Sequence, residues 1–154
     1  MLSAVYCNPQ RGPEVNHNLI KLEPGLYLVA TPLGSARDIT LRALDILASA
    51  DVLAAEDTRT ARKLLDIHGV PLAGRRIIAY HDHSQAKDRQ KLLQHVVEGK
   101  SVAYVSEAGT PLIADPGYQL VADARREGLT ILSAPGPAAC IAALTVAGLP
   151  TDQF

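Results

Sequence analysis

Five short apolar runs, each followed by an amphipathic segment, constrain the fold of this chain more than any other feature. The runs lie at residues 26–30, 52–55, 76–80, 101–105 and 129–132, and they are typical of buried strands. Helical spacing of apolar residues follows each run, at residues 40–50, 58–68, 84–98, 117–127 and 137–147. This alternation predicts an α/β fold with a five-stranded, mostly parallel sheet and helices on both faces.

Capping residues predict where the helices begin and end. Asp38 or Thr40 is expected at the start of the first helix, and Ser84 at the start of the third. The last helix is expected to carry Pro137 in its first turn and to stop at Gly148, because proline favours helix starts and glycine helix ends.

Composition indicates the kind of core and narrows the partners. Of 154 residues, 47% are hydrophobic, but only one is Phe, five are Tyr and none is Trp, so we expect an aliphatic core. A formal net charge of −1 provides no global attraction to nucleic acid or to an anionic membrane. Cys7 and Cys140 form no C-x-x-C motif, which argues against a structural zinc, and Cys140 is expected to be a small core residue.

The N-terminal segment differs in character from the rest. Residues 1–24 show no sustained period and contain several Pro and Asn residues, so we expect a flexible extension before a domain at 25–154. No apolar run approaches the roughly 18 residues that span a membrane, and no signal-peptide pattern is present. We therefore expect a cytoplasmic protein without a membrane partner.

Ligands of parallel α/β sheets bind beyond the carboxyl ends of the strands. This rule selects residues 31–39, 56–57, 81–83, 106–116 and 133–136 before any motif is considered. Residues 31–39 contain a single glycine rather than G-x-G-x-x-G, and the chain has no G-x-x-x-x-G-K-[ST] motif. Classical NAD binding is therefore disfavoured, and a P-loop is excluded.

The segment 106–116 is the longest of these connections, against the usual length of about 2–6 residues. Gly109 permits close approach of a ligand to the backbone, and Ala108 and Ile113 offer an apolar wall. Thr110 could accept a hydrogen bond from ribose. A purely structural loop that covers the sheet edge is the alternative.

Polar candidates follow the second and third strands. Asp57 or Glu56 could orient a substrate hydroxyl while Arg59 binds phosphate, although Asp57 or Thr58 could equally be a helix cap. His81 and His83 lie on the same side of an expected extended segment, and either could orient substrate or accept a proton. Two histidines without a third ligand make a metal site improbable, so no metal is predicted. The nearest approach to a basic patch is formed by Arg59, Arg62, Lys63, Arg75 and Arg76.

Five strings, in order and at matching spacing, resemble the ribosomal RNA small subunit methyltransferase I family of the tetrapyrrole methylase superfamily. They are LYLVATPLGSARDIT, AAEDTR, HDHS, VSEAGTPLIADPGYQLV and PGPAACIAALTVAGLPTDQF. Ser35 and Glu107 depart from the Asn and Asp that are usual in the family, and the Glu107 side chain is longer than Asp by one methylene group.

The resemblance implies an S-adenosylmethionine-dependent enzyme that methylates a cytidine ribose 2′-hydroxyl of 16S rRNA in the small ribosomal subunit. It also implies two domains with the cofactor between them, of which this chain would hold only the N-terminal one. Cofactor contacts carried over from the family fall on Leu33, Ala108, Gly109, Thr110, Ile113, Ala138 and Ala139. Around the reacting hydroxyl we expect Asp57, Arg59 and His83.

Two other functions remain open at this stage. One is methylation of a tetrapyrrole by the same fold; the other is a nucleotide-binding or assembly module without catalysis of its own. The second follows from the resemblance, which implies that the other half of the cofactor cleft lies in a domain that this chain does not hold. We therefore expect this chain alone to be inactive. Exposed apolar surface at the missing interface further predicts a homodimer.

Overall fold

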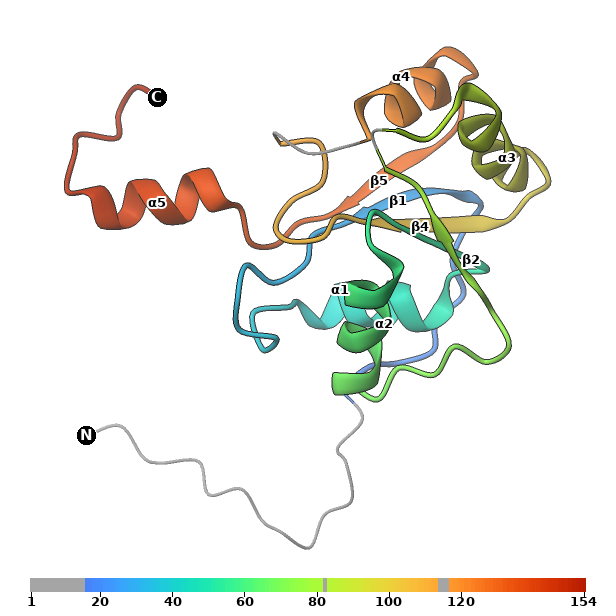
Figure 1. The fold of residues 1–154 in the computed structure, drawn as a ribbon, viewed down its shortest axis with the longest axis horizontal. Coiled ribbons are helices and arrows are strands. Elements are labelled where there is room, and N and C mark those ends of the chain that lie inside the picture. The colour runs from blue at the N-terminus through green and yellow to red at the C-terminus, as the bar shows by residue number, and fades with distance from the viewer. Residues whose placement is uncertain (1–15, 82, 114–116) are drawn as a thin grey trace, which may run out of the picture.

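The computed structural model describes residues 16–81, 83–113 and 117–154, which contain a single five-stranded sheet (Figure 1). The strands lie in the order β3-β2-β4-β1-β5, and all neighbouring pairs are parallel. Their bounds are β1 (Gly25–Val29), β2 (Val52–Ala55), β3 (Ile77–Ala79), β4 (Ser101–Val105) and β5 (Ile131–Ala134). The predicted α/β class is confirmed, and the sheet is parallel throughout.

Helices cover both faces of this sheet, as predicted. α1 (Leu41–Ser49) and α2 (Thr58–Ile67) pack against one face, whereas α3 (Ala86–Val97) and α4 (Tyr118–Arg126) pack against the other (Figure 1). Each face has its own core, because side chains alternate along a strand: Leu53 and Ala55 face α1 and α2, and Ala54 faces α3.

The connections give one strand a special position. The chain moves from β1 through β2 to β3 with α1 and α2 on one face, and it returns through β4 to β5 with α3 and α4 on the other. The loop that follows β4 therefore diverges from the loops that follow its two neighbours, β1 and β2. Such a switch point is where ligands bind in open α/β sheets.

The core is aliphatic apart from three tyrosines, which the composition did not lead us to expect there. Tyr27, Tyr80 and Tyr104 are all at most 5% exposed. The rings of Tyr80 and Tyr104 meet edge to face, with centroids 5.7 Å apart, an arrangement favoured by aromatic quadrupoles. Tyr104 is the largest side chain that is fully buried.

Every predicted element end lies within two residues of the observed one, and one predicted cap differs. Thr40 caps α1, and its hydroxyl oxygen accepts the N–H of Ala43 at 3.1 Å. The predicted cap Ser84 was wrong: Gln85 and Asp88 form a capping box at the start of α3. Ser84 Oγ instead accepts the N–H of His81 at 2.9 Å, because it lies in the preceding turn.

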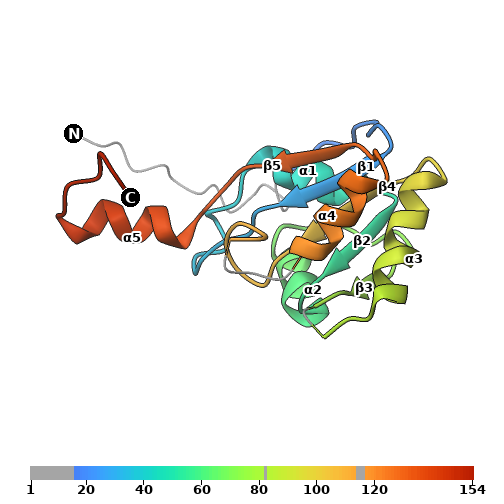
Figure 2. The same ribbon diagram turned by 90° about the horizontal axis from the view of Figure 1, so that it is seen from above.

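The last helix, α5 (Ala139–Ala147), has no buried residue and extends away from the sheet (Figure 2). The prediction that Cys140 is a core residue was therefore wrong, since its side chain is exposed. Pro137 lies before the helix rather than in its first turn, and Ala138 is the N-cap. Gly148 ends the helix with φ +65°, as predicted.

Part of the expected N-terminal extension runs along α1. The N–H of Asn18 donates to Asp45 Oδ1 at 2.6 Å, and that of Ile20 donates to Ser49 Oγ at 2.9 Å. Residues 1–15, including Cys7, lie outside the described residues. Within the described ranges, no helix is both long and apolar enough to cross a bilayer.

Candidate functional site

Three of the five strand-end loops are joined into one unit, because β4, β1 and β5 are neighbours in the sheet. Thr31 and Gly109 exchange backbone hydrogen bonds at 2.9 and 3.0 Å, which tie the β1 loop to the β4 loop. The Thr110 hydroxyl donates to the carbonyl oxygen of Pro137 at 2.8 Å and so reaches the β5 loop. Ser106, which is buried, donates to the carbonyl oxygen of Gly109 at 2.9 Å.

Gly109 occupies a position that only glycine fits without strain. Its φ is +82°, and an added Cβ would lie 3.0 Å from Leu33 Cδ2 and 3.7 Å from the Pro137 carbonyl oxygen. Gly136 is similarly close, since its Cβ would lie 2.9 Å from the Cβ of Ala30. The backbones of the three loops therefore meet closely around Gly109.

The outer side of this unit presents apolar side chains to solvent. Leu33 is 40% exposed and Ile113 is 58% exposed, although both lie at the carboxyl edge of a well-packed sheet. Ala108 and Ala139 are also exposed, and Ala138 is half-buried. The structure thus gathers residues of all three predicted cofactor loops into one region, with Gly109 buried beneath it.

Leu112 adds backbone strain to the β4 loop. Its φ of +73° is unfavourable for a residue with a branched side chain, at a cost of about 1–2 kcal/mol. Such strain persists only where surrounding contacts impose it, and it concentrates at functional sites. Asp115, in the same loop, lies outside the described residues.

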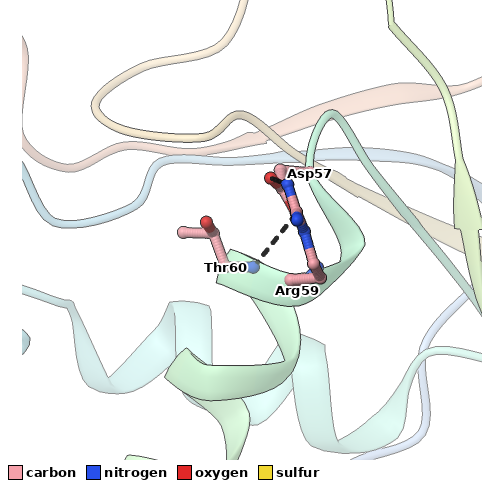
Figure 3. Close-up of polar contacts among 3 residues, drawn as sticks. All are labelled: Asp57, Arg59 and Thr60. Atoms are coloured by element: carbon pink, nitrogen blue, oxygen red, sulfur yellow. Dashed lines mark hydrogen bonds and ion pairs between the residues drawn. The ribbon is translucent and has the colours of Figure 1, made fainter.

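Asp57 and Arg59 form a compact ion pair at the start of α2 (Figure 3). Asp57 is the N-cap of α2, and its Oδ1 accepts the N–H groups of Arg59 at 2.7 Å and Thr60 at 3.3 Å. The guanidinium Nη2 of Arg59 donates to Asp57 Oδ2 at 3.1 Å. Asp57 is therefore the helix cap, which was one of the roles that the sequence allowed, and it also pairs with the guanidinium group of Arg59.

These hydrogen bonds further stabilise the charged form of the Asp57 carboxylate. The side-chain hydrogen bond from Arg59, followed by the backbone N–H groups of Arg59 and Thr60, lowers its pKa to about 2. Asp57 is therefore a weak proton acceptor at neutral pH. The Arg59 side chain is 90% exposed, so its remaining donors can reach a ligand.

Glu56, which the sequence suggested only as a residue that orients a substrate hydroxyl, links the loops after β2 and β4. Its Oε2 accepts the N–H of Glu107 at 3.1 Å, and its own N–H donates to the Val105 carbonyl oxygen at 3.2 Å. The β2 loop is thereby tied to the start of the β4 loop. No local pattern identifies this bond, because the two glutamates are 51 residues apart.

The expectation of an extended segment around His81 and His83 was wrong. The N–H of Ser84 donates to the His81 carbonyl oxygen at 2.8 Å, which closes a tight turn. The two imidazole rings still contact each other, with centroids 6.0 Å apart. Both histidines are exposed, and no described hydrogen bond or ion pair joins His83 to Asp57 or Arg59.

The predicted basic patch divides in the structure. Arg75 is a structural clamp, since its guanidinium donates to the carbonyl oxygens of Leu47, Ala50, Pro71 and Leu72. Arg62 pairs with Asp66 one turn later on α2. Among residues 16–81, 83–113 and 117–154, no group of three or more His, Cys, Asp or Glu side chains could hold a metal ion.

Comparison with known proteins gives a consistent picture. A family model described as "Tetrapyrrole (Corrin/Porphyrin) Methylases" matches residues 25–154. "Ribosomal RNA small subunit methyltransferase I" of Mesorhizobium japonicum is 53% identical over 133 residues, which are 86% of this chain and 44% of that protein. The protein of the same name from Escherichia coli O157:H7 is 48% identical over 84% of this chain and 44% of its own length. The family resemblance in the sequence is thus confirmed.

A solved structure supports the fold independently. The crystal structure of uroporphyrin-III-C-methyltransferase from Thermus thermophilus matches with a TM-score of 0.61 at 26% identity. The match covers 84% of this chain and 54% of that one. The chain therefore spans about half the length of the relatives and of the solved structure that it matches.

Proposed function

This chain belongs to the tetrapyrrole (corrin/porphyrin) methylase family, and from that premise we propose that it binds S-adenosylmethionine as one half of an rRNA methyltransferase. The observation that carries the proposal is the union of the β4, β1 and β5 loops around Gly109. We expect the substrate to be a ribose 2′-hydroxyl of 16S rRNA in the small ribosomal subunit. The activity and the substrate are proposed for a whole protein. The relatives are about twice as long as this chain.

The residues present fit the proposed cofactor. An adenosyl group and a thioether chain need an apolar wall beside backbone and hydroxyl donors. Leu33 and Ile113 supply exposed apolar surface, Ala108, Ala138 and Ala139 leave room beside it, and Gly109 and Thr110 bring backbone close. Bound S-adenosylmethionine would supply an electrophilic methyl group, and the protein would supply alignment and exclusion of water.

The low pKa of Asp57 argues that the proton acceptor for the substrate hydroxyl is another residue. Asp57 would remain a carboxylate and hold Arg59 at the start of α2. Arg59 would bind a phosphate or stabilise negative charge that develops on the attacking oxygen. The role of proton acceptor is then left to His83, which is exposed on the neighbouring turn.

Titration calorimetry with S-adenosylmethionine tests the cofactor site. Gly109→Ala should weaken binding by about tenfold or more, because the new methyl group meets Leu33 at 3.0 Å in a strained backbone conformation. Gly34→Ala is the matched control on the β1 loop, since nothing lies within 4 Å of its added Cβ. Equal affinity in both variants and the wild type would refute the assignment of the site.

A tetrapyrrole substrate is the competing proposal, and the solved uroporphyrin-III methyltransferase supports it at 26% identity. The relatives at 48–53% identity are named for rRNA methylation instead, which favours RNA. Methyl transfer from labelled cofactor to small ribosomal subunits or to uroporphyrinogen would distinguish the two. We further propose that the 154-residue chain alone has little activity and serves as a cofactor-binding half, which the same assay measures.

A further inference from the structure

A polar cavity of about 100 Å³ lies at the carboxyl edge of the sheet, outside the proposed cofactor site. Its lining comes from the turn after β3, from α3 and from the start of α4, and comprises Tyr80, His81, Ser84, Arg89, Gly117, Tyr118 and Gln119. Of the candidate residues considered above, only His81 lines it among the described residues, and the proposed function gives His81 no role. The face that carries α3 and α4 thus has a site that the proposed function leaves unused.

Among the described residues that line this cavity, Arg89 is the one cation, and an ion pair holds it in place. Arg89 Nε donates to a carboxylate oxygen of Asp123, and the other oxygen accepts from Arg126 Nη1 at 2.9 Å. Asp123 is only 8% exposed, and Arg89 keeps 17% of its side chain exposed. Arg126, which is exposed in the last turn of α4 and does not line the cavity, shares this carboxylate, so Asp123 is divided between two guanidinium groups.

Neutral donors surround the guanidinium. Ser84 Oγ accepts the N–H of His81 at 2.9 Å, which orients its hydroxyl group in the turn. Gly117 has φ +118°, and an added Cβ would lie 3.0 Å from the Tyr104 ring, so α4 begins close against that ring. No side chain of the described ranges caps this helix start. Arg, Ser and Gln side chains with helix N–H groups are the usual set that contacts phosphates of nucleic acids.

The cavity lies beside the proposed reaction centre. The N–H of Tyr80 donates to the carbonyl oxygen of Ala55 at 2.8 Å, two residues before Asp57. Neighbouring parallel strands are about 4.8 Å apart, so the cavity and the Asp57–Arg59 pair flank the end of β2. The loops of β2 and β3 leave the sheet toward opposite faces, which puts the two sites on either side of that end.

We propose that this cavity binds one backbone phosphate of the polynucleotide substrate and thereby positions the target ribose at the end of β2. The identity of the polynucleotide rests on the proposed function, whereas anion binding in the cavity does not. A phosphate fits because its tetrahedral oxygens can accept from donors on three segments at once.

Titration of the ¹⁵N-labelled protein with inorganic phosphate, at constant ionic strength set with NaCl, tests the anion site. Saturable shifts are expected at the amides of Ser84, Gly117 and Gln119. Gln119→Glu should weaken binding by about tenfold, because it adds a negative charge to the lining while favouring the start of α4. Gln153→Glu, which makes the same change in the exposed C-terminal segment, should leave the affinity within about twofold.

A short oligoribonucleotide distinguishes the source of the phosphate. It should shift the same three amides and compete with inorganic phosphate. RNA shifts confined to other residues would overturn the substrate assignment, and phosphate binding of equal strength in Gln119→Glu would overturn the site. S-adenosylmethionine, titrated into the same sample, reports at Gly109 and Thr110, so failure of the proposed function is seen separately.

Discussion

Helices α1 and α5 have the same length, and α5 is the more apolar of the two, yet α1 is packed against the sheet and α5 is exposed. Five of the nine residues of α1 are buried, whereas α5 has none. α1 carries polar residues such as Arg42 and Asp45 on one side, and α5, with the sequence ACIAALTVA, has apolar residues all round. A helix that is apolar on every side needs cover on every side. The helices α1 to α4 are packed against the sheet, whereas no described residue covers α5.

Loss of apolar volume should separate the two helices most strongly. Leu44 of α1 is 1% exposed, so Leu44→Ala should lower the free energy of unfolding by about 2–5 kcal/mol. Ile141 of α5 is 45% exposed, and Ile141→Ala should cost less than about 0.5 kcal/mol. Urea denaturation followed by circular dichroism measures both. Similar losses in the two variants would mean that α5 is covered in solution.

The next comparison is between Gly117, at the start of the packed helix α4, and Gly148, at the end of the exposed helix α5. Gly117→Ala places a methyl group 3.0 Å from Tyr104 at φ +118°, and should destabilise the protein by about 2–3 kcal/mol. Gly148→Ala, at the end of α5, has φ +65° but nothing within 4 Å, and should cost about 1 kcal/mol or less. The midpoints of thermal unfolding report the ranking, and a reversed order would contradict it.

The exposed apolar surface of α5 is a candidate interface for the homodimer that was predicted from the sequence. Val146 is 84% exposed, and Leu149, just after the helix, is 66% exposed. If a second copy covers this surface, Val146→Glu should raise the dimer dissociation constant by about tenfold or more, because a charge would be buried. Gln90→Glu, at an exposed position of α3, is the control for charge. Sedimentation velocity that finds only monomers of the wild type would exclude the dimer.

The smallest expected effect concerns the pH dependence of the body. The pKa of Asp57 is lowered to about 2, so its stabilising contribution is complete above about pH 4 and is lost as the pH falls through 2. Asp57→Asn keeps a good helix cap but removes the pairing with Arg59. At pH 6 its Tm should be lower by about one to two degrees, a modest shift because solvent screens the pair.

The same variant should approach the wild type between pH 4 and pH 2. Asp152→Asn, in the exposed segment after α5, reports the effect of net charge alone. A Tm difference for Asp57→Asn that stays constant from pH 6 to pH 2 would rule out the ion pair as its cause.

Local sequence patterns determined the class of fold and most of its elements. The strands 52–55 and 101–105 were predicted with the bounds observed, because β-branched and small apolar runs between helical segments have few other solutions. The strand-end rule also selected the loops that carry Gly109 and Asp57, since parallel strands bring their carboxyl ends to one edge.

Only the tertiary structure decided which of those loops meet and which apolar residues are buried. The order β3-β2-β4-β1-β5 joins Thr31 to Gly109 and Glu56 to Glu107, and strand order is set by packing across the whole sheet. Cys140 was expected in the core because its neighbours are apolar, yet burial requires a partner surface that the described chain does not supply to α5. Apolar composition indicates that a segment is stabilised by burial, whereas the tertiary structure determines whether a surface is available to bury it.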